Sequence, residues 1–595
     1  MLVPYQNLAA QAVSFLRGHP RAGSILASLA TAGLLGKLVL FFWRCQQVNW
    51  KRQARQEKAR ARTKKMAETV ANVTDSRSII KKSVEDLRQA LKSGSLSALE
   101  VLHAFQKEAL RVTQDTNSVV EPIMEAEALA KALDASPGFK GLLHGIPVSI
   151  KENVALKGYD FTAGMAGGIG KDCEEDSVIV KVIKLQGAVP FVRTNIPQTM
   201  LSYDCSNPLY GTTCNPQDLS RTPGGSSTGE GALIGGGGSI MGIGGDIGGS
   251  LRAPAEFCGI YTLKPTWDRI SRKGLMSHTR GNLAVRPVQG PMARDFDSLL
   301  LLSKAIMSPP MYELDPTLPD HPFDTMEYEK TTALRIGFYT FDGIFQCQPA
   351  NVRAVMTAKT ALEAAGHEVV HFDFPTIIDG GFQPGRHYIR LVTADKLARL
   401  RKLMAYDKME PRVKMYLRFG QLPVWFCKAA KFIVGLKDRV LPVVFDTAIG
   451  FGSMEEYFQC VEGLEEFRDK FLIAWQSLDL DAVICPVFPG PAPTRDIAGL
   501  MTPAGTYCWL YNSLNYPSGV VPVTKVTQED VDKAFDPKVF KPQNVYEKLL
   551  LKSAKGSQGL SVGVQCVGLP HREEMCLRVM RDLTQALGKE IKSEL

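Results

Sequence analysis

A glycine-rich run, residues 223–254, holds four serines, and Ser226, Ser227 and Ser250 are the candidates to attack a carbonyl group. A serine hydroxyl is a poor nucleophile near neutral pH, so each needs a base that removes its proton. Ser227 lies in a G-x-S-x-G match, but glycine-rich sequence produces that pattern by chance, and the later histidines have no distinctive setting. The run lacks G-x-x-x-x-G-K-[ST], so a phosphate-binding loop has little support.

The candidate base is Lys151, at the end of the apolar stretch GIPVSIKE. A lysine is normally protonated, and it can act as a base only if burial lowers its pKa. The stretch predicts a buried strand that ends at Lys151 and Glu152, which is consistent with such burial. For an isolated lysine at a strand end, a salt bridge is the commoner role, so the assignment depends on the serines.

Together these segments resemble the amidase signature family. That family combines G-x-P-x-x-x-K-[ED] with two glycines, a serine pair, a glycine-rich spacer and D-x-G-x-S-[LIVM]-R-x-P. The matching positions are Lys151, Gly224, Gly225, Ser226, Ser227, Gly229, Gly242, Gly244, Asp246, Gly248, Ser250, Leu251, Arg252 and Pro254. Thr228 stands where the family usually has Gly or Ser, and its small size predicts only a slight local adjustment. The resemblance covers about residues 80–590.

The resemblance implies a Ser–Ser–Lys triad. Ser250 corresponds to the attacking nucleophile, and Ser226 corresponds to a bridging serine that passes the proton toward Lys151. On the return path Ser226 would protonate the leaving amine, which departs poorly without a proton. A cis peptide between Gly225 and Ser226 is also implied.

The resemblance further implies an oxyanion hole of backbone N–H groups, because glycine lets the backbone approach a carbonyl oxygen closely. The corresponding residues are Ile247, Gly248, Gly249 and Ser250. Met200 falls where membrane-anchored family members have a methionine beside the substrate, and Leu201 replaces the aromatic residue that follows it there. No metal or organic cofactor is implied, and the sequence has neither C-x-x-C nor H-E-x-x-H.

Apolar strands alternate with helical patterns through the rest of the chain. Residues 177–195 predict a helix, a stop at Gly187 and a strand, and residues 334–374 predict a strand, a helix and a strand. This alternation is typical of an α/β fold. We predict one large catalytic domain over residues 76–595, and the family resemblance implies a large, mixed, twisted β-sheet that helices cover on both faces.

An apolar segment, residues 23–43, follows a short amino-terminal segment, residues 1–22. Its length matches a bilayer core of about 30 Å. The apolar segment therefore predicts a single-pass transmembrane helix. The basic segment that follows it, residues 44–75, predicts that the catalytic domain lies in the cytoplasm. A cleaved signal peptide and a buried globular helix are the alternatives. The basic segment itself is expected to be a solvated linker or helix.

A second apolar stretch, residues 422–445, predicts a helix in the membrane interface, within a group of interfacial helices near residues 411–445. Its lysines lie outside an apolar stripe made of Trp425, Ala429, Phe432, Ile433, Leu436 and Val440. The alternative is an ordinary core helix.

The 595 residues carry a net charge of +9 and twelve scattered cysteines. This composition favours reduced thiols facing the cytosol and gives no reason to expect nucleic-acid binding. The resemblance and the two apolar segments imply a serine hydrolase that cleaves fatty acid amides, such as N-acylethanolamines and primary fatty amides, through an acyl-enzyme. We expect it on an intracellular membrane, the endoplasmic reticulum or another endomembrane, and a homodimer is implied by the resemblance alone. The alternatives are an amidase or esterase of short-chain substrates and a catalytically inactive membrane-tethered scaffold.

Overall fold

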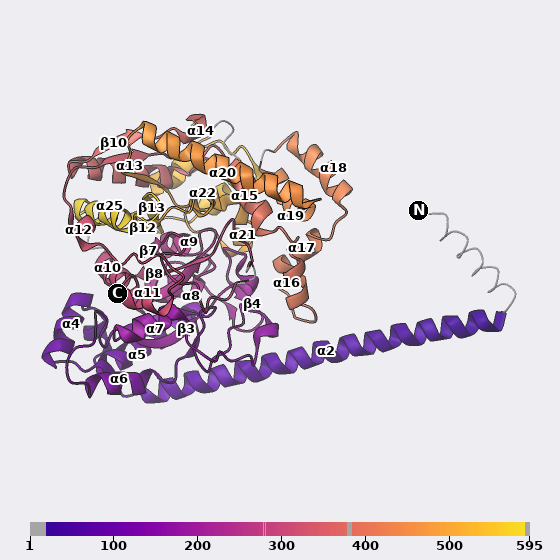
Figure 1. Cartoon of the computed structure of the whole chain (residues 1–595), viewed down its shortest axis with the longest axis horizontal. Coiled ribbons are helices and arrows are strands. Elements are labelled where there is room, and N and C mark those ends of the chain that lie inside the picture. Colours follow the sequence, from indigo (N-terminus) through magenta and orange to yellow (C-terminus); the bar gives the residue numbers. More distant parts are fainter. Residues whose placement is uncertain (1–19, 278, 280, 378–382, 439, 589–595) are drawn as a thin grey trace.

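The computed structural model describes residues 20–588, except 278, 280, 378–382 and 439. An 11-stranded sheet runs through the predicted catalytic domain (Figure 1). Its strands, in sheet order, are β1 (Val119–Pro122), β3 (Val189–Thr194), β2 (Pro147–Lys151), β6 (Met241–Asp246), β8 (Val288–Ala293), β7 (Tyr261–Lys264), β12 (Ser518–Lys525), β13 (Ser561–Val567), β11 (Ala482–Pro486), β9 (Arg335–Phe338) and β10 (Glu368–His371). A separate two-stranded sheet pairs β4 (Ser206–Asn207) with β5 (Gly211–Thr212).

The sheet is mixed, as predicted. Strand β2 runs parallel to β3 and β6, whereas β6 and β8 are antiparallel. Every residue of β2, β3, β6 and β13 is buried. Since successive side chains of a strand point to opposite faces, both faces of the sheet are covered there.

Helices surround the sheet (Figure 1). They are α2 (Pro20–Thr69), α3 (Ser76–Ile80), α4 (Val84–Ser93), α5 (Ala98–Thr116), α6 (Ala126–Asp134), α7 (Val178–Leu185), α8 (Thr228–Gly235), α9 (Arg252–Cys258), α10 (Phe296–Ile306), α11 (Pro309–Leu314), α12 (Thr325–Glu329), α13 (Pro349–Ala364), α14 (Phe374–Ile377), α15 (Gln383–Val392), α16 (Ala398–Leu403), α17 (Pro411–Phe419), α18 (Val424–Gly435), α19 (Leu441–Ile449), α20 (Met454–Ser477), α21 (Arg495–Ala498), α22 (Thr506–Ser513), α23 (Gln528–Phe535), α24 (Val545–Ala554) and α25 (Glu573–Ala586). The predicted helix and strand over residues 177–195 are α7 and β3, and those over residues 334–374 include β9, α13 and β10.

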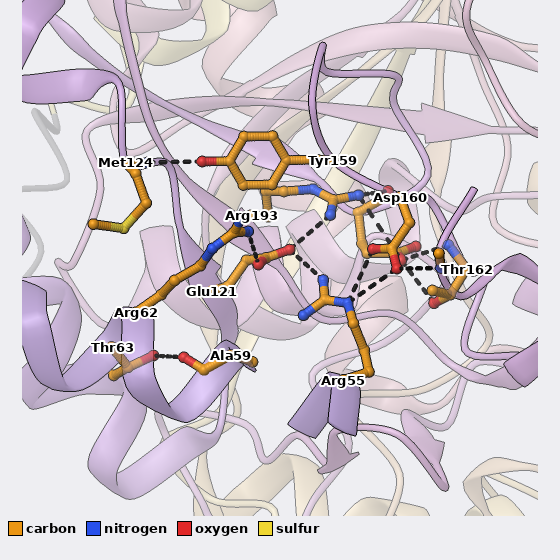
Figure 2. Close-up of polar contacts among 12 residues, drawn as sticks. Arg55, Ala59, Arg62, Thr63, Glu121, Met124, Tyr159, Asp160, Thr162 and Arg193 are labelled. Atoms are coloured by element: carbon orange, nitrogen blue, oxygen red, sulfur yellow. Dashed lines mark hydrogen bonds and ion pairs between the residues drawn. The ribbon is translucent and has the colours of Figure 1, made fainter. Parts of the chain in front are cut away.

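Helix α2 continues through most of the segment predicted to be a basic linker or helix. Its carboxyl-terminal half lies against the rest of the fold, and its amino-terminal half extends away from it (Figure 1). The basic side chains are not all solvated, because Arg55 is buried and binds Glu121 and Asp160 (Figure 2). Arg62 Nη1 also donates to Glu121 Oε2, at 2.5 Å. A buried carboxylate needs cationic partners, and α2 supplies two of them.

Within the described residues, we find no helix with both the length and the apolar character needed to cross a membrane. The predicted spanning segment, residues 23–43, lies partly outside the described residues, since nothing is described of the side chains of 23–27, 29 and 30. Most of the predicted amino-terminal segment, residues 1–19, lies outside them as well.

The second apolar stretch forms two helices, not the continuous helix that its stripe predicts. Helix α18 ends at Gly435, and α19 begins at Leu441 with Pro442 in its first turn. The stripe prediction is therefore wrong for Val440, which is buried at the start of α19. Trp425, Phe432 and Leu436 are 71–73% exposed, so this part of the stripe faces away from the protein core.

Candidate active site

Lys151 is the last residue of β2, a strand buried on both faces between β3 and β6. Its ammonium or amine group, Nζ, donates to Ser226 Oγ at 2.9 Å and to Ser227 Oγ at 3.0 Å. The carbonyl oxygen of Gly245 lies 3.3 Å away. The buried strand predicted from GIPVSIKE is confirmed, and it brings the lysine to both neighbouring serines.

Burial lowers the pKa of Lys151 from 10.5 to about 7, because a charged amine loses its hydration there. Nearby carboxyl groups, Asp246 first among them, oppose this change by favouring the protonated form. The net effect makes the neutral amine abundant near neutral pH. A lysine with these properties can accept a proton from a hydroxyl group.

The serine pair stands at the start of α8. The Gly225–Ser226 peptide bond is cis, as the family resemblance implies. Ser227 Oγ donates to Gly245 O at 3.1 Å and accepts from Gly245 N–H at 3.2 Å, so its hydroxyl is fixed between Lys151 and β6. The Ser227 N–H donates to Ser250 O at 3.1 Å, which joins the serine pair to the second serine segment.

Ser250 lies in a tight turn between β6 and α9. Gly249 has a φ of +101°, which residues with a side chain rarely adopt. The carboxylate of Asp246 accepts N–H groups from Gly249 at 2.8 Å and from Leu251 at 3.0 Å. Asp246 also forms a fully buried ion pair with Arg252 at 3.1 Å. The turn is therefore held from inside, by one carboxylate.

The predicted oxyanion hole is only partly supported by this turn. The N–H of Gly249 donates to Asp246, so it does not point to a substrate oxygen. In the described part of the chain, the N–H groups of Ile247, Gly248 and Ser250 have no hydrogen-bond partner. These three remain candidates to stabilise a negatively charged oxygen.

A cavity of about 100 Å³ lies beside this turn. Ser250, Met200, Tyr388 and Trp509 are among the residues that line it, and Ile247 and Gly248 line it as well. The rings of Tyr388 and Trp509 stack with centroids 4.6 Å apart. Lys151 and Ser226 are not among the lining residues. Of the predicted triad, Ser250 is thus the residue that meets the cavity.

A second cavity, of about 610 Å³, adjoins the first. Both are lined by Leu201, Ser202, Leu397 and Tyr416. Ligand sites in proteins commonly have volumes of about 300–1,000 Å³, so the two cavities together are large enough for an organic ligand.

Several residues at the site have no clear signal in the sequence. Tyr388 lies more than a hundred residues from the glycine-rich run, and its approach to Gly248 is a property of the tertiary fold. Ser227 was visible in the signature, but its hydrogen bond to Lys151 was not predicted. The family pattern includes Asp246 and Arg252, and a D-x-x-x-x-x-R spacing around a serine could have suggested their ion pair. Among the described residues, we find no group of three or more His, Cys, Asp or Glu side chains that could hold a metal ion.

Comparisons with known proteins give a consistent result. A family model described as Amidase matches residues 100–577. Fatty-acid amide hydrolase 1 of Sus scrofa is 39% identical over 555 residues, which cover 90% of this chain and 93% of that protein. Fatty acid amide hydrolase 1 of Caenorhabditis elegans is 35% identical over 511 residues, covering 84% and 88%. A solved structure of a fatty acid amide hydrolase has a TM-score of 0.76 at 24% identity, over 93% of this chain and 96% of the other, which shows a shared fold.

Proposed function

Because this chain is an amide-hydrolysing member of the amidase signature family, we propose that its substrates are fatty acid amides and that Ser250 attacks them. The observation that carries the proposal is the buried Lys151 amine, hydrogen-bonded to Ser226, in a serine pair that is joined through the Ser227 N–H to Ser250, which lines a cavity. A neutral amine, a hydroxyl relay and a nucleophile open to substrate are the three parts that acyl transfer requires.

In the proposed first step, Ser250 Oγ forms a bond to the amide carbonyl carbon. Its proton moves to Ser226 Oγ, and the proton of Ser226 moves to Lys151 Nζ. The carbonyl oxygen becomes negatively charged and accepts the N–H groups of Ile247, Gly248 and Ser250.

In the second step, the carbon–nitrogen bond breaks. Ser226 donates its proton to the leaving nitrogen and regains one from Lys151, so the amine departs neutral. Water then attacks the acyl-enzyme ester, with its proton passing along the same relay to Lys151. The fatty acid leaves, and Ser250 recovers its hydroxyl proton.

The preference for a long acyl chain is supported by the two adjoining cavities and by the two relatives described above. Met200, Leu201 and Leu397 contribute apolar side chains to the cavity walls. Such walls favour a hydrocarbon chain by removing it from water. A short-chain amide would leave most of this surface unused.

We also propose that the protein works at a membrane surface. Two groups of exposed apolar side chains support this association: one on α18 and one on the extended half of α2. The second group comprises Leu34, Leu35, Leu38, Val39, Leu40, Phe41, Phe42 and Trp43. Exposed apolar patches of this kind mark interaction sites on soluble domains.

Ser250→Ala tests the nucleophile. We expect it to lower hydrolysis of a long-chain amide in detergent by at least about a thousandfold, since the attacking hydroxyl is lost. Ser202→Ala is the matched control, because Ser202 lines both cavities and has no part in the proposed relay. We expect this control to retain activity within a few-fold. Full activity in Ser250→Ala would contradict the assignment.

A chain-length series tests the substrate class. The wild-type protein is assayed on amides that differ only in acyl length, and kcat/KM is compared. We expect kcat/KM to rise with each added methylene until the cavities are filled, by up to about fourfold per methylene. A maximum at acetamide or propionamide would instead favour the short-chain amidase.

A further inference from the structure

Glu230 is a buried carboxyl group in the first turn of α8, and the proposed mechanism does not use it. Ser149 Oγ donates to Glu230 Oε2 at 2.5 Å, and Thr194 Oγ1 donates to Glu230 Oε1 at 2.8 Å. Both carboxyl oxygens are therefore bound by hydroxyl groups from the neighbouring strands. The space it occupies is tight, since a Cβ added at Gly242 would lie 2.0 Å from Glu230 Oε2.

The two hydroxyl partners lie close to Lys151 in the sheet. Ser149 is two residues before Lys151 on β2, and Thr194 on β3 is the register partner of Lys151 itself. Helix α8, which carries Glu230, begins directly after Ser226 and Ser227. One carboxyl group thus ties together the strand that holds the lysine, the adjacent strand and the helix start that holds the serines.

Four acidic groups near Lys151 can favour its protonated form: Asp246, Glu230, Cys205 and Glu152. Three of them either have a cationic partner or stay neutral. Asp246 pairs with Arg252, and Glu152 lies 3.8 Å from Arg193 while accepting from Thr162. Burial raises the pKa of the Cys205 thiol to about 12, which keeps it neutral.

Glu230 is different from these three groups. Among the ion pairs of the described residues, none includes Glu230, so its charge acts on Lys151 without a cation of its own. Burial raises the pKa of Glu230 to about 7, close to that of Lys151. A change in its charge therefore falls in the pH range in which Lys151 gains or loses its proton.

We propose that Glu230 is a positioning residue for Lys151: its carboxyl group fixes the lysine relative to the two serine hydroxyls, and its charge adjusts how firmly the lysine holds a proton. This inference rests on the proposed role of Lys151 as the base. An ionised Glu230 favours protonated Lys151 by Coulomb attraction, so removing that charge lets the lysine lose its proton at lower pH.

Glu230→Gln separates charge from position. Glutamine has nearly the same shape and can hydrogen-bond both hydroxyls, but it is always neutral. We expect the acidic limb of the kcat/KM profile for a long-chain amide to move to lower pH by about half a unit to one unit. Glu256→Gln is the matched control: Glu256 is also fully buried, on α9, and donation from Asn351 satisfies one of its oxygens. Its profile should coincide with that of the wild type.

Glu230→Ala tests the positioning itself. We expect kcat to fall by about a hundredfold with KM little changed, and Glu230→Gln to restore most of the loss. Circular dichroism gives the folded fraction of each variant, and kcat is calculated per folded molecule. The proposal is overturned if the Glu230→Gln and wild-type profiles coincide, or if Glu256→Gln moves the limb equally. If the wild-type protein does not hydrolyse amides, the proposed function is contradicted. The role of Lys151 as the base, on which the proposal for Glu230 rests, is then contradicted with it.

Discussion

Lys151 contacts two serine hydroxyls at almost the same distance, yet their surroundings differ. Ser227 Oγ is bound to both the N–H and the carbonyl oxygen of Gly245, which fixes its orientation. A hydroxyl held in this way is poorly suited to pass a proton in alternating directions. Ser226 is better suited to the relay, which agrees with its correspondence in the family pattern.

Lys151→Ala should affect amides more than esters. An amine leaves only after the relayed proton reaches it, whereas an alkoxide is a better leaving group, so the amide loses both base and acid catalysis. We expect kcat/KM to fall by about a thousandfold or more for a long-chain amide. For the matching ester, the fold-loss in kcat/KM should be smaller by a factor of at least about ten. Both substrates are assayed with the same enzyme preparation.

Lys264→Met is the control for that experiment. Lys264 is a second fully buried lysine, on β7, and burial also lowers its pKa to about 7. Its Nζ donates to Pro265 O at 3.0 Å, and it does not contact the serines. We expect the amide-to-ester ratio to stay unchanged in this variant. Equal losses on amide and ester in Lys151→Ala would rule out the proposed proton relay.

The sequence predicts the residues that carry chemistry better than the residues that support them. Ser226 and Ser250 stand in one dense glycine-rich run, and Lys151 stands in a second short motif 75 residues before Ser226, so the family pattern picks out all three. The hydrogen bond from the Gly249 N–H to Asp246 was not predicted, because it depends on the exact shape of the turn. Glu230 also lies in the run, but its hydroxyl partners come from strands that only the folded sheet brings together.

At the scale of elements, the carboxyl-terminal half of α2 packs against the sheet through buried ion pairs. Arg55 and Arg62 on α2 meet Glu121 on β1, and Arg193 on β3 donates to the same carboxylate at 2.8 Å (Figure 2). Arg193 Nη2 also donates to the carbonyl oxygen of Glu152 at 2.6 Å, directly after Lys151. A continuous set of polar contacts therefore runs from α2 to the end of strand β2.

Arg55→Met should destabilise the protein. Removing Arg55 takes away the cation paired with the buried Asp160 and leaves Glu121 with Arg62 and Arg193 alone, at a cost of about 3 kcal/mol or more. The measurement is the unfolding temperature together with denaturant unfolding. Arg60→Met is the control, because Arg60 is an exposed arginine on the same helix. We expect its effect on the free energy of unfolding to stay within about 0.5 kcal/mol. Equal stability of the two variants would mean that the buried contacts contribute little.

Individual helices and strands could be predicted from the sequence where their pattern of apolar residues was uninterrupted. The buried strand β2 and the helix–strand unit α7–β3 are examples, since apolar runs and Gly187 define their limits. The break between α18 and α19 was missed because an apolar stripe continues across it, and the stripe cannot reveal where Gly435 ends one helix. The burial of Arg55 was missed for a different reason: a run of basic residues is usually solvated, and its carboxylate partners, Glu121 and Asp160, lie 66 and 105 residues further along the chain.

At the scale of the molecule, the exposed side chains of α18 should contribute to membrane binding. Phe432→Ser combined with Leu436→Ser removes two large apolar groups, each worth about 1.5–3 kcal/mol when fully buried. We expect sedimentation with anionic phospholipid vesicles to weaken by at least about tenfold, while activity on a detergent-dispersed amide is retained. Met326→Ser is the control, since Met326 is 81% exposed on α12, at the other end of the molecule (Figure 1). Unchanged sedimentation would contradict a role for α18.

The packing of α2 against β1 has a consequence for solubility. An open sheet has two edge strands, here β1 and β10, whose unpaired backbone groups can pair with another chain. Strand β1 has only four residues and ends in Pro122, and α2 lies against it. Short length, a proline and a covering element are three ways in which natural proteins prevent strand addition. Helix α2 therefore has two roles along its length: its amino-terminal half extends away from the domain, and its carboxyl-terminal half protects edge strand β1 from pairing with another chain.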